Sequence, residues 1–226
     1  MYLINTLYFK GQWAIRFETR STKQRPFYLF SGETVQKPLM SFQKRIRYME
    51  TPDAQICQLS FSDSPVVMMV VLPKSKSPEA LISCATHEFQ LQRLIELQAQ
   101  MTSVEVALQL PRFRIEFASS LKEVLSRLGA ADAFTPNAHF SRMVKEAGEP
   151  NKPKVYIDDV LHQAVLSVDE NGVEAAAATV VRMRMLMASI RPMTIPVSMI
   201  VNRPFAVALF DEETHSVFFS GLIQNP

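Results

Sequence analysis

The sequence has little cysteine and no excess of charge of either sign. Only two of its 226 residues are cysteine, Cys57 and Cys84, too few for a disulfide framework and without metal-ligand spacing. We expect two free, buried thiols, with a single bridge as the alternative. The 24 Lys and Arg residues nearly balance the 22 Asp and Glu residues. No overall charge therefore favours nucleic acid or an anionic membrane as a partner.

Long apolar runs are also missing. None reaches the roughly 18 to 20 residues that a membrane-spanning helix needs, and 47% hydrophobic with 20% charged residues is ordinary for a globular chain. Residues 1–13 lack the basic start, apolar core and cleavage site of a signal peptide. They are strand-like from the first residue, so we expect the N-terminal part of a larger domain to be absent from these residues.

Familiar catalytic motifs are absent from the sequence as well. It contains no Gly-x-Ser-x-Gly elbow, no Gly-rich phosphate loop and no His-Glu-x-x-His. The four histidines are dispersed, without the close spacing that suggests a metal site: His87, His139, His162 and His215. We therefore expect neither an enzyme nor a bound metal or other cofactor, and interpret His162 as a hydrogen-bonded structural group within a strand.

The patterns that are present predict strands with scattered helices. Alternating or continuous apolar residues predict strands at 1–9, 54–61, 65–73, 103–117 and 155–172, antiparallel strands within 25–51 around a Ser-Gly turn, and a C-terminal hairpin within 199–226. We expect the first strand to be buried and the 65–73 strand to be covered on both faces. Two short helices are predicted within 77–101, starting at Ser77-Pro78. The order indicates an α+β fold with mixed or antiparallel sheets.

One further helix is predicted at 118–129. Four apolar residues at helical spacing would form its buried face, and Gly129 would end it. The four are Leu121, Val124, Leu125 and Leu128.

The segment "DENGVEAAAATVVRMRMLMASIRP", residues 169–192, has no persistent helical face. As a strand, it would place small uncharged side chains on one face and Glu174 and Arg182 on the other. The small face is Val173, Ala175, Ala177, Thr179 and Val181. It could enter an existing sheet without burying a charge. The segment is therefore compatible with two states, an exposed loop or an inserted strand.

Four stretches together resemble the serpin family over essentially all 226 residues. They are "INTLYFKGQW", "LPRFRIEFASSLKEVLSRLGAADAFTPNAHFSRM", "VLHQAVLSVDENGVEAAAAT" and "VNRPFAVALFDEETHSVFFSGLIQNP". The resemblance implies one serpin domain over 1–226, N-terminally incomplete, with a large mixed main sheet, smaller antiparallel sheets, surface helices and an exposed reactive-centre loop at 170–193.

The resemblance also implies a mechanism and the residues that serve it. A serine protease would attack the loop and form an acyl-enzyme, and the cleaved loop would insert into the main sheet and distort the protease. The implied hinge is Glu170, Gly172, Val173, Glu174, Ala175, Ala176, Ala177, Ala178 and Thr179. Glu170 would pair with Arg112, for which an ordinary surface ion pair is the alternative. Asn5 and His162 would form a structural gate beneath the sheet.

The cleaved bond is left open by two counts. Counting from the hinge gives Leu186-Met187, which suits chymotrypsin-like or elastase-like proteases, and we prefer it because insertion depth is measured from the hinge. Counting back from "NRPF" gives Met193-Thr194. Arg184-Met185 would suit trypsin-like proteases, whereas Arg191 precedes Pro192, where such enzymes cleave poorly.

The resulting expectation is a secreted suicide inhibitor of a serine protease. It would need no cofactor and bind neither nucleic acid nor membrane, and loop-sheet self-association is a further expectation. Because the first strands and backing helices are not among these residues, we expect the chain alone to inhibit weakly or not at all. The alternative is a non-inhibitory protein of the same fold, such as a carrier, a chaperone or a truncated product.

Overall fold

The computed structural model describes residues 1–9, 11–140, 155–173 and 195–226. The chain divides into two compact units. The first comprises Met1–Phe9 with Arg114–Leu166, and the second comprises Lys10–Phe113 with Ser167–Pro226. Strands and a few helices make up both, as the α+β expectation required.

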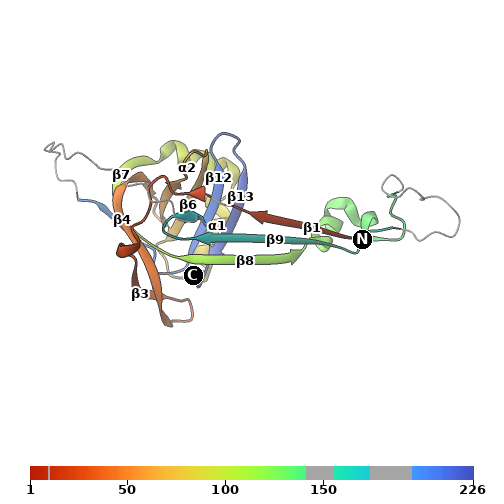
Figure 1. The fold of residues 1–226 in the computed structure, drawn as a ribbon, viewed down its shortest axis with the longest axis horizontal. Helices are drawn as coiled ribbons and strands as arrows, with labels where there is room; N and C mark the ends of the chain where they lie inside the picture. Colours follow the sequence, from red (N-terminus) through yellow and green to blue (C-terminus); the bar gives the residue numbers. More distant parts are fainter. Residues whose placement is uncertain (10, 141–154, 174–194) are drawn as a thin grey trace. The chain divides into compact units, whose positions relative to one another are not determined.

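The first unit is built on strand pairing around β9. Strand β1 (Tyr2–Tyr8) pairs in parallel with β9 (Asp159–Val168), with Tyr2 opposite Asp159 and Tyr8 opposite Val165. Strand β8 (Phe113–Ser120) also pairs with β9, and Figure 1 shows the three strands running side by side. The strand expected at 1–9 is present, but the expectation that it is buried was wrong. Most of β1 is exposed because few side chains of its own unit cover it.

Short helical turns follow β8 in the first unit: α3 (Lys122–Leu125), η2 (Ser126–Ala130) and η3 (Ala131–Phe134). Phe134, Ile157 and Val160 form a small core there, against which Leu121 and Leu125 pack. The predicted amphipathic helix was therefore only half right, because Val124 and Leu128 are exposed and the α-helix itself has four residues. Gly129 has a φ of +102°, which favours glycine and interrupts the helical backbone.

The second unit contains an eight-stranded sheet in the order β11-β7-β4-β5-β6-β12-β13, with β3 paired to β4. Its strands are β3 (Lys23–Tyr28), β4 (Thr34–Glu50), β5 (Ala54–Ser60), β6 (Val66–Pro73), β7 (Thr102–Pro111), β11 (Val197–Ile200), β12 (Phe205–Asp211) and β13 (Val217–Ile223). Two short strands, β2 (Gly11–Gln12) and β10 (Gly172–Val173), and the turn η1 (Thr19–Ser21) complete the unit. The predicted Ser-Gly turn between β3 and β4 is confirmed, and Gly32 has a φ of +84°.

The main core lies where α1 (Pro78–Glu88) and α2 (Leu91–Gln100) pack on this sheet. All eight residues of β6 are buried, as its unbroken apolar run predicts. The Ser77 hydroxyl accepts a hydrogen bond from the Ala80 backbone N–H, so the predicted helix start is a genuine N-cap. The predicted hairpin is also present as β12 and β13.

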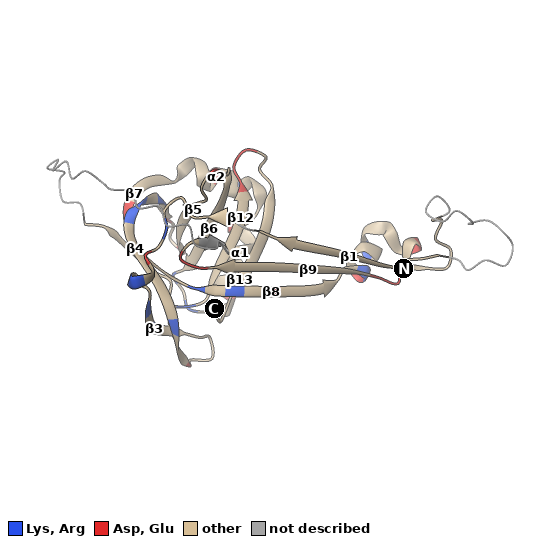
Figure 2. Ribbon diagram, viewed as in Figure 1, with Lys and Arg blue, Asp and Glu red and all other residues tan. Residues whose placement is uncertain are grey.

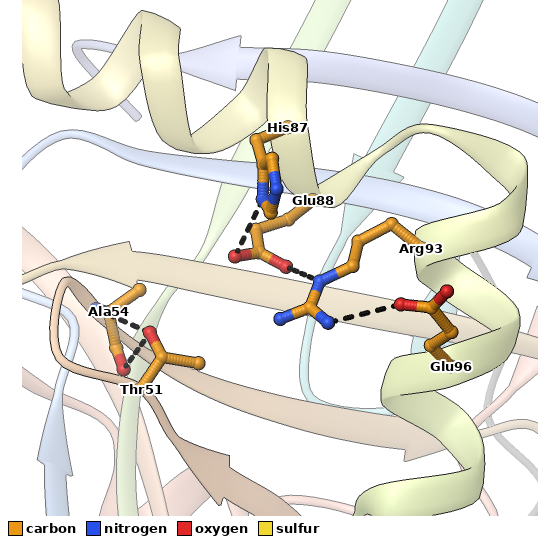
Figure 3. Close-up of polar contacts among 6 residues, drawn as sticks. All are labelled: Thr51, Ala54, His87, Glu88, Arg93 and Glu96. Atoms are coloured by element: carbon orange, nitrogen blue, oxygen red, sulfur yellow. Dashed lines mark hydrogen bonds and ion pairs between the residues drawn. The ribbon is translucent and has the colours of Figure 1, made fainter.

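Both helices are joined by charged side chains between the end of α1 and the start of α2. Buried Glu88 accepts hydrogen bonds from Arg93, whose guanidinium also pairs with Glu96. Figure 3 shows His87 on the other oxygen of Glu88. Because Glu88 lies at the edge of the core, this ion pair holds the two helices together without leaving a buried carboxylate unpaired.

Both cysteines are free and buried, as predicted from their number and spacing. Burial raises the pKa of the Cys57 thiol to about 12. Burial, with smaller effects of Glu88 and Asp53, raises the pKa of Cys84 as well. Because the thiolate is the reactive form, neither thiol is activated for chemistry.

Candidate functional site at the root of the loop

The predicted loop 170–193 begins within the described part of the chain and then leaves it. Glu170 to Val173 are described. The remaining hinge residues and every candidate cleavage position lie outside the described residues: Glu174, Ala175, Ala176, Ala177, Ala178, Thr179, Arg184, Met185, Leu186, Met187 and Met193. The site that can be described is therefore the loop root and the strands that hold it.

Glu170 is the anchored residue at this root. Its side chain is 5% exposed, and its Oε1 accepts hydrogen bonds from Arg112 Nη2 at 2.5 Å and from Thr22 Oγ1 at 2.6 Å. Burial favours the neutral acid, but the hydrogen bonds from Arg112 and Thr22 outweigh it and lower the pKa of Glu170. The partners expected from the sequence are thus in contact, and burial of Glu170 distinguishes the pair from an ordinary surface ion pair.

Local sequence explains the positions of these three residues. Arg112 follows the last residue of β7, and its backbone N–H bonds to the Pro38 carbonyl of β4, which fixes its place at the sheet end. Thr22 follows the single turn η1, and its backbone N–H bonds to the Thr19 carbonyl. Sequence reasoning did not find Thr22, because a lone threonine 148 residues from its partner leaves no local pattern.

Aromatic residues after β2 hold the backbone on both sides of Glu170. Trp13 Nε1 donates to the Asp169 carbonyl at 2.8 Å, and the Trp13 backbone N–H donates to the Asn171 carbonyl at 2.9 Å. The Phe17 backbone N–H bonds to the Glu170 carbonyl at 3.0 Å. Trp13 is itself stacked on Phe61, with ring centroids 4.5 Å apart. The loop root therefore rests on a rigid base.

Gly172 and Val173 form β10, the first residues of the hinge. They pair in antiparallel fashion with Gln12 and Gly11 of β2. Val173 also pairs with Val168, so the chain reverses direction between β9 and β10. The hinge thus starts as a strand, as the small-residue face of this segment predicts.

The structure also brings together Asn5 and His162, the pair expected to form a gate. They are direct partners in the parallel β1–β9 register, and His162 Nδ1 lies 3.0 Å from Asn5 Oδ1. The bond is exposed rather than beneath the sheet, because β1 itself is exposed. No strand separates β1 from β9 over their seven paired positions.

Other kinds of site were sought in the same coordinates. Among residues 1–9, 11–140, 155–173 and 195–226, no three His, Cys, Asp or Glu side chains gather as they would around a metal ion. The helices within those ranges are too short or too polar to cross a bilayer.

Comparison with known proteins places the chain among familiar sequences. The family model described as Serpin (serine protease inhibitor) matches residues 1–226. Antithrombin-III of Ovis aries is 32% identical over 225 residues, which cover 99% of this chain and 46% of that protein. Corticosteroid-binding globulin of Ovis aries is 31% identical over 226 residues, covering 99% of this chain and 48% of the relative.

A solved structure agrees with these similarities. The native state of Tengpin, a thermophilic serpin, superimposes with a TM-score of 0.77 at 28% identity, covering 100% of this chain and 55% of that one. The chain therefore spans about half the length of the curated relatives that it matches.

Proposed function

Because the chain belongs to the serpin (serine protease inhibitor) family, we propose that it traps a serine protease as a suicide substrate, through the loop that follows β10. The observation that carries the proposal is the direct parallel pairing of β1 with β9, the strand that leads into the loop. This arrangement corresponds to a sheet that is still closed, with the loop outside it.

Insertion would improve the strand pairing of the first unit. A loop that reverses after β9 and enters between β9 and β1 runs antiparallel to both. It would replace one parallel ladder by two antiparallel ones, which are slightly more stable per residue and hydrogen-bond a strand that was previously unpaired. The hydrogen bond between Asn5 and His162 must break first, so this pair acts as the gate.

Loop composition suits insertion. Residues 173, 175, 177 and 179 on one strand face are Val, Ala, Ala and Thr, none of which brings a charge into the sheet. Glu170 supplies the fixed end, because its bonds to Arg112 and Thr22 hold the root while the rest of the hinge moves. A protease attached downstream would be pulled against that fixed point.

Target preference follows from the cleaved bond. With Leu186-Met187 as the reactive bond, the target is a chymotrypsin-like or elastase-like protease. Cleavage at Arg184-Met185 is the second choice and would indicate a trypsin-like protease. We place this activity outside the cell, without a cofactor.

The test is incubation of the 226-residue chain with a panel of serine proteases, followed by mass mapping of the cleaved bond. The proposal expects cleavage within 182–187 and a large rise in the thermal midpoint after nicking, because the freed loop can then insert. The thermal comparison is the more sensitive measurement, since we expect weak inhibition from these residues alone. An SDS-stable complex would support the mechanism directly.

A second candidate is a serpin-fold protein that does not inhibit. Corticosteroid-binding globulin, whose name describes a carrier, is about as similar to the chain as antithrombin-III. A nicked chain with an unchanged thermal midpoint and no protease complex would favour this candidate and contradict inhibition.

A further inference from the structure

A pocket of about 540 Å³ lies in the second unit, away from the candidate cleavage positions. Its polar lining comes from β4, β5, α2, β7 and the residue after β12: Arg45, Arg47, Gln58, Gln98, Ser103 and Glu212. Trp13 and Ile15 add an apolar wall. The volume is within the range of about 300 to 1,000 Å³ that is typical of small-molecule sites.

Gln58 is the unusual residue of this pocket. It is 4% exposed, and its Nε2 donates to Glu212 Oε1 at 2.9 Å. Its Oε1 is buried and has no hydrogen-bond partner among the described residues. A buried acceptor without a donor is costly, because it has lost its water and gained nothing in return. A ligand with an O–H or N–H group would satisfy it.

Glu212 fixes the orientation of that amide. Its Oε1 accepts from both Gln58 Nε2 and Gln98 Nε2, so the two amide nitrogens are committed to the carboxylate. With Nε2 of Gln58 occupied in this way, its oxygen is the group left for a ligand. The requirement is therefore for a donor, and an acceptor would not meet it.

The charges beside Gln58 favour an anion. Arg47 lies directly opposite Gln58 in the β4–β5 register, and Figure 2 shows basic residues along β4. Arg47 donates to the Gln98 carbonyl at 3.3 Å and lies 3.8 Å from Glu212, and Arg45 donates to the Ser103 carbonyl at 2.7 Å. Each guanidinium has five N–H donors, so these contacts leave others for a ligand. Two arginines face one glutamate, which leaves the lining positive.

We propose that this pocket binds a small organic anion that also carries a hydrogen-bond donor. The carboxylate contacts Arg45 and Arg47, the donor reaches Gln58 Oε1, and the apolar body lies against Trp13 and Ile15. The proposal is independent of protease inhibition, because it uses no residue of the loop.

The probe is 4-hydroxyphenylacetate, titrated against the 226-residue chain. Trp13 is the only tryptophan, so its fluorescence reports on the pocket directly. We expect a saturable change. Phenylacetate, which lacks the hydroxyl donor, and 4-methylphenol, which lacks the carboxylate, should each bind at least tenfold more weakly.

Two variants assign the contacts. Gln58→Leu should weaken 4-hydroxyphenylacetate at least tenfold and leave phenylacetate unchanged, while the free protein keeps or gains thermal stability because the unpaired acceptor is gone. Arg47→Gln should weaken both carboxylates and leave 4-methylphenol unchanged. Arg25→Gln, an exposed arginine on β3 outside the pocket, is the matched control and should change nothing.

Three results would overturn the proposal. One is the absence of any saturable signal with 4-hydroxyphenylacetate. Another is equal binding of the probes with and without the hydroxyl, which would mean that water alone satisfies Gln58. The third is unchanged binding in Arg47→Gln. If Gln58→Leu does not fold, the probe comparison and Arg47→Gln decide the question.

Discussion

At the scale of single residues, the contacts of Glu170 decide how firmly the loop root is held. A carboxylate that is almost fully buried would be unfavourable alone, and here one oxygen accepts two hydrogen bonds, from Arg112 and Thr22. Half-exposed Arg112 can return to water, whereas Glu170 cannot. Changes to the acid should therefore cost more than changes to the base.

Glu170→Gln tests this anchor, because the amide imitates the protonated acid. At pH 7 we expect a loss of about 1 kcal/mol in the free energy of unfolding, the usual difference between a charged and a neutral hydrogen bond. Urea denaturation of the variant and of the original chain measures it. Glu33→Gln, at an exposed glutamate, is the control and should be neutral.

The same pair predicts a pH dependence. The folded pKa of Glu170 lies below its ordinary value of 4.5, so the carboxylate stabilises the folded state fully above pH 4.5. That contribution is lost as the pH falls through the lowered pKa. The stability difference between the original chain and Glu170→Gln should consequently narrow between pH 5 and pH 3. A difference that is constant over this range would contradict the anchoring role.

At the scale of elements, the feature that matters is the junction of β9 with the hinge. Strand β9 pairs with β1, and the chain has already reversed at β10. In a strand that continues this reversal, side chains alternate between the two faces of the sheet. Neighbouring alanines of the hinge should therefore differ sharply in their tolerance of a charge.

Ala177→Glu and Ala176→Glu form a matched pair on opposite faces of the hinge strand. Position 177 shares the uncharged face with Val173, so a carboxylate there should block insertion and abolish the rise in thermal midpoint after nicking. Position 176 shares the face of Glu174, and its variant should keep most of the rise. Differential scanning fluorimetry before and after cleavage measures both. Equal behaviour of the two variants would argue against strand insertion.

At the scale of the whole molecule, the two units differ in how well they bury apolar side chains. The second unit has a continuous core between its sheet and the two helices. The first has only the small cluster around Phe134 and leaves Tyr2, Ile4, Phe117 and Leu128 exposed. Exposed apolar strands promote association between chains.

We expect concentration-dependent self-association through β1, measurable by sedimentation. Ile4, which is 74% exposed on β1, is the residue to change. Ile4→Lys should lower the average mass towards that of the monomer. Ile82→Lys, at a residue 54% exposed on α1, adds the same charge elsewhere and should leave association unchanged. Equal effects of the two variants would indicate that charge alone is responsible.

The sequence by itself determined the elements whose signals are local. The apolar run of β6, the Ser77 cap of α1, the Gly32 turn and the C-terminal hairpin all depend on neighbours within a few residues, and all are present. The small-residue hinge and the family resemblance were also legible there, because both are written in short motifs.

Tertiary structure alone decided what lies against what. Thr22 beside Glu170, the unpaired Oε1 of Gln58 and the exposure of β1 and Leu128 have no local signature. Each depends on chain segments tens of residues apart, up to 148 for Thr22 and Glu170. Periodicity predicts which face of an element is apolar, but whether another segment covers that face is settled only when the whole chain has folded.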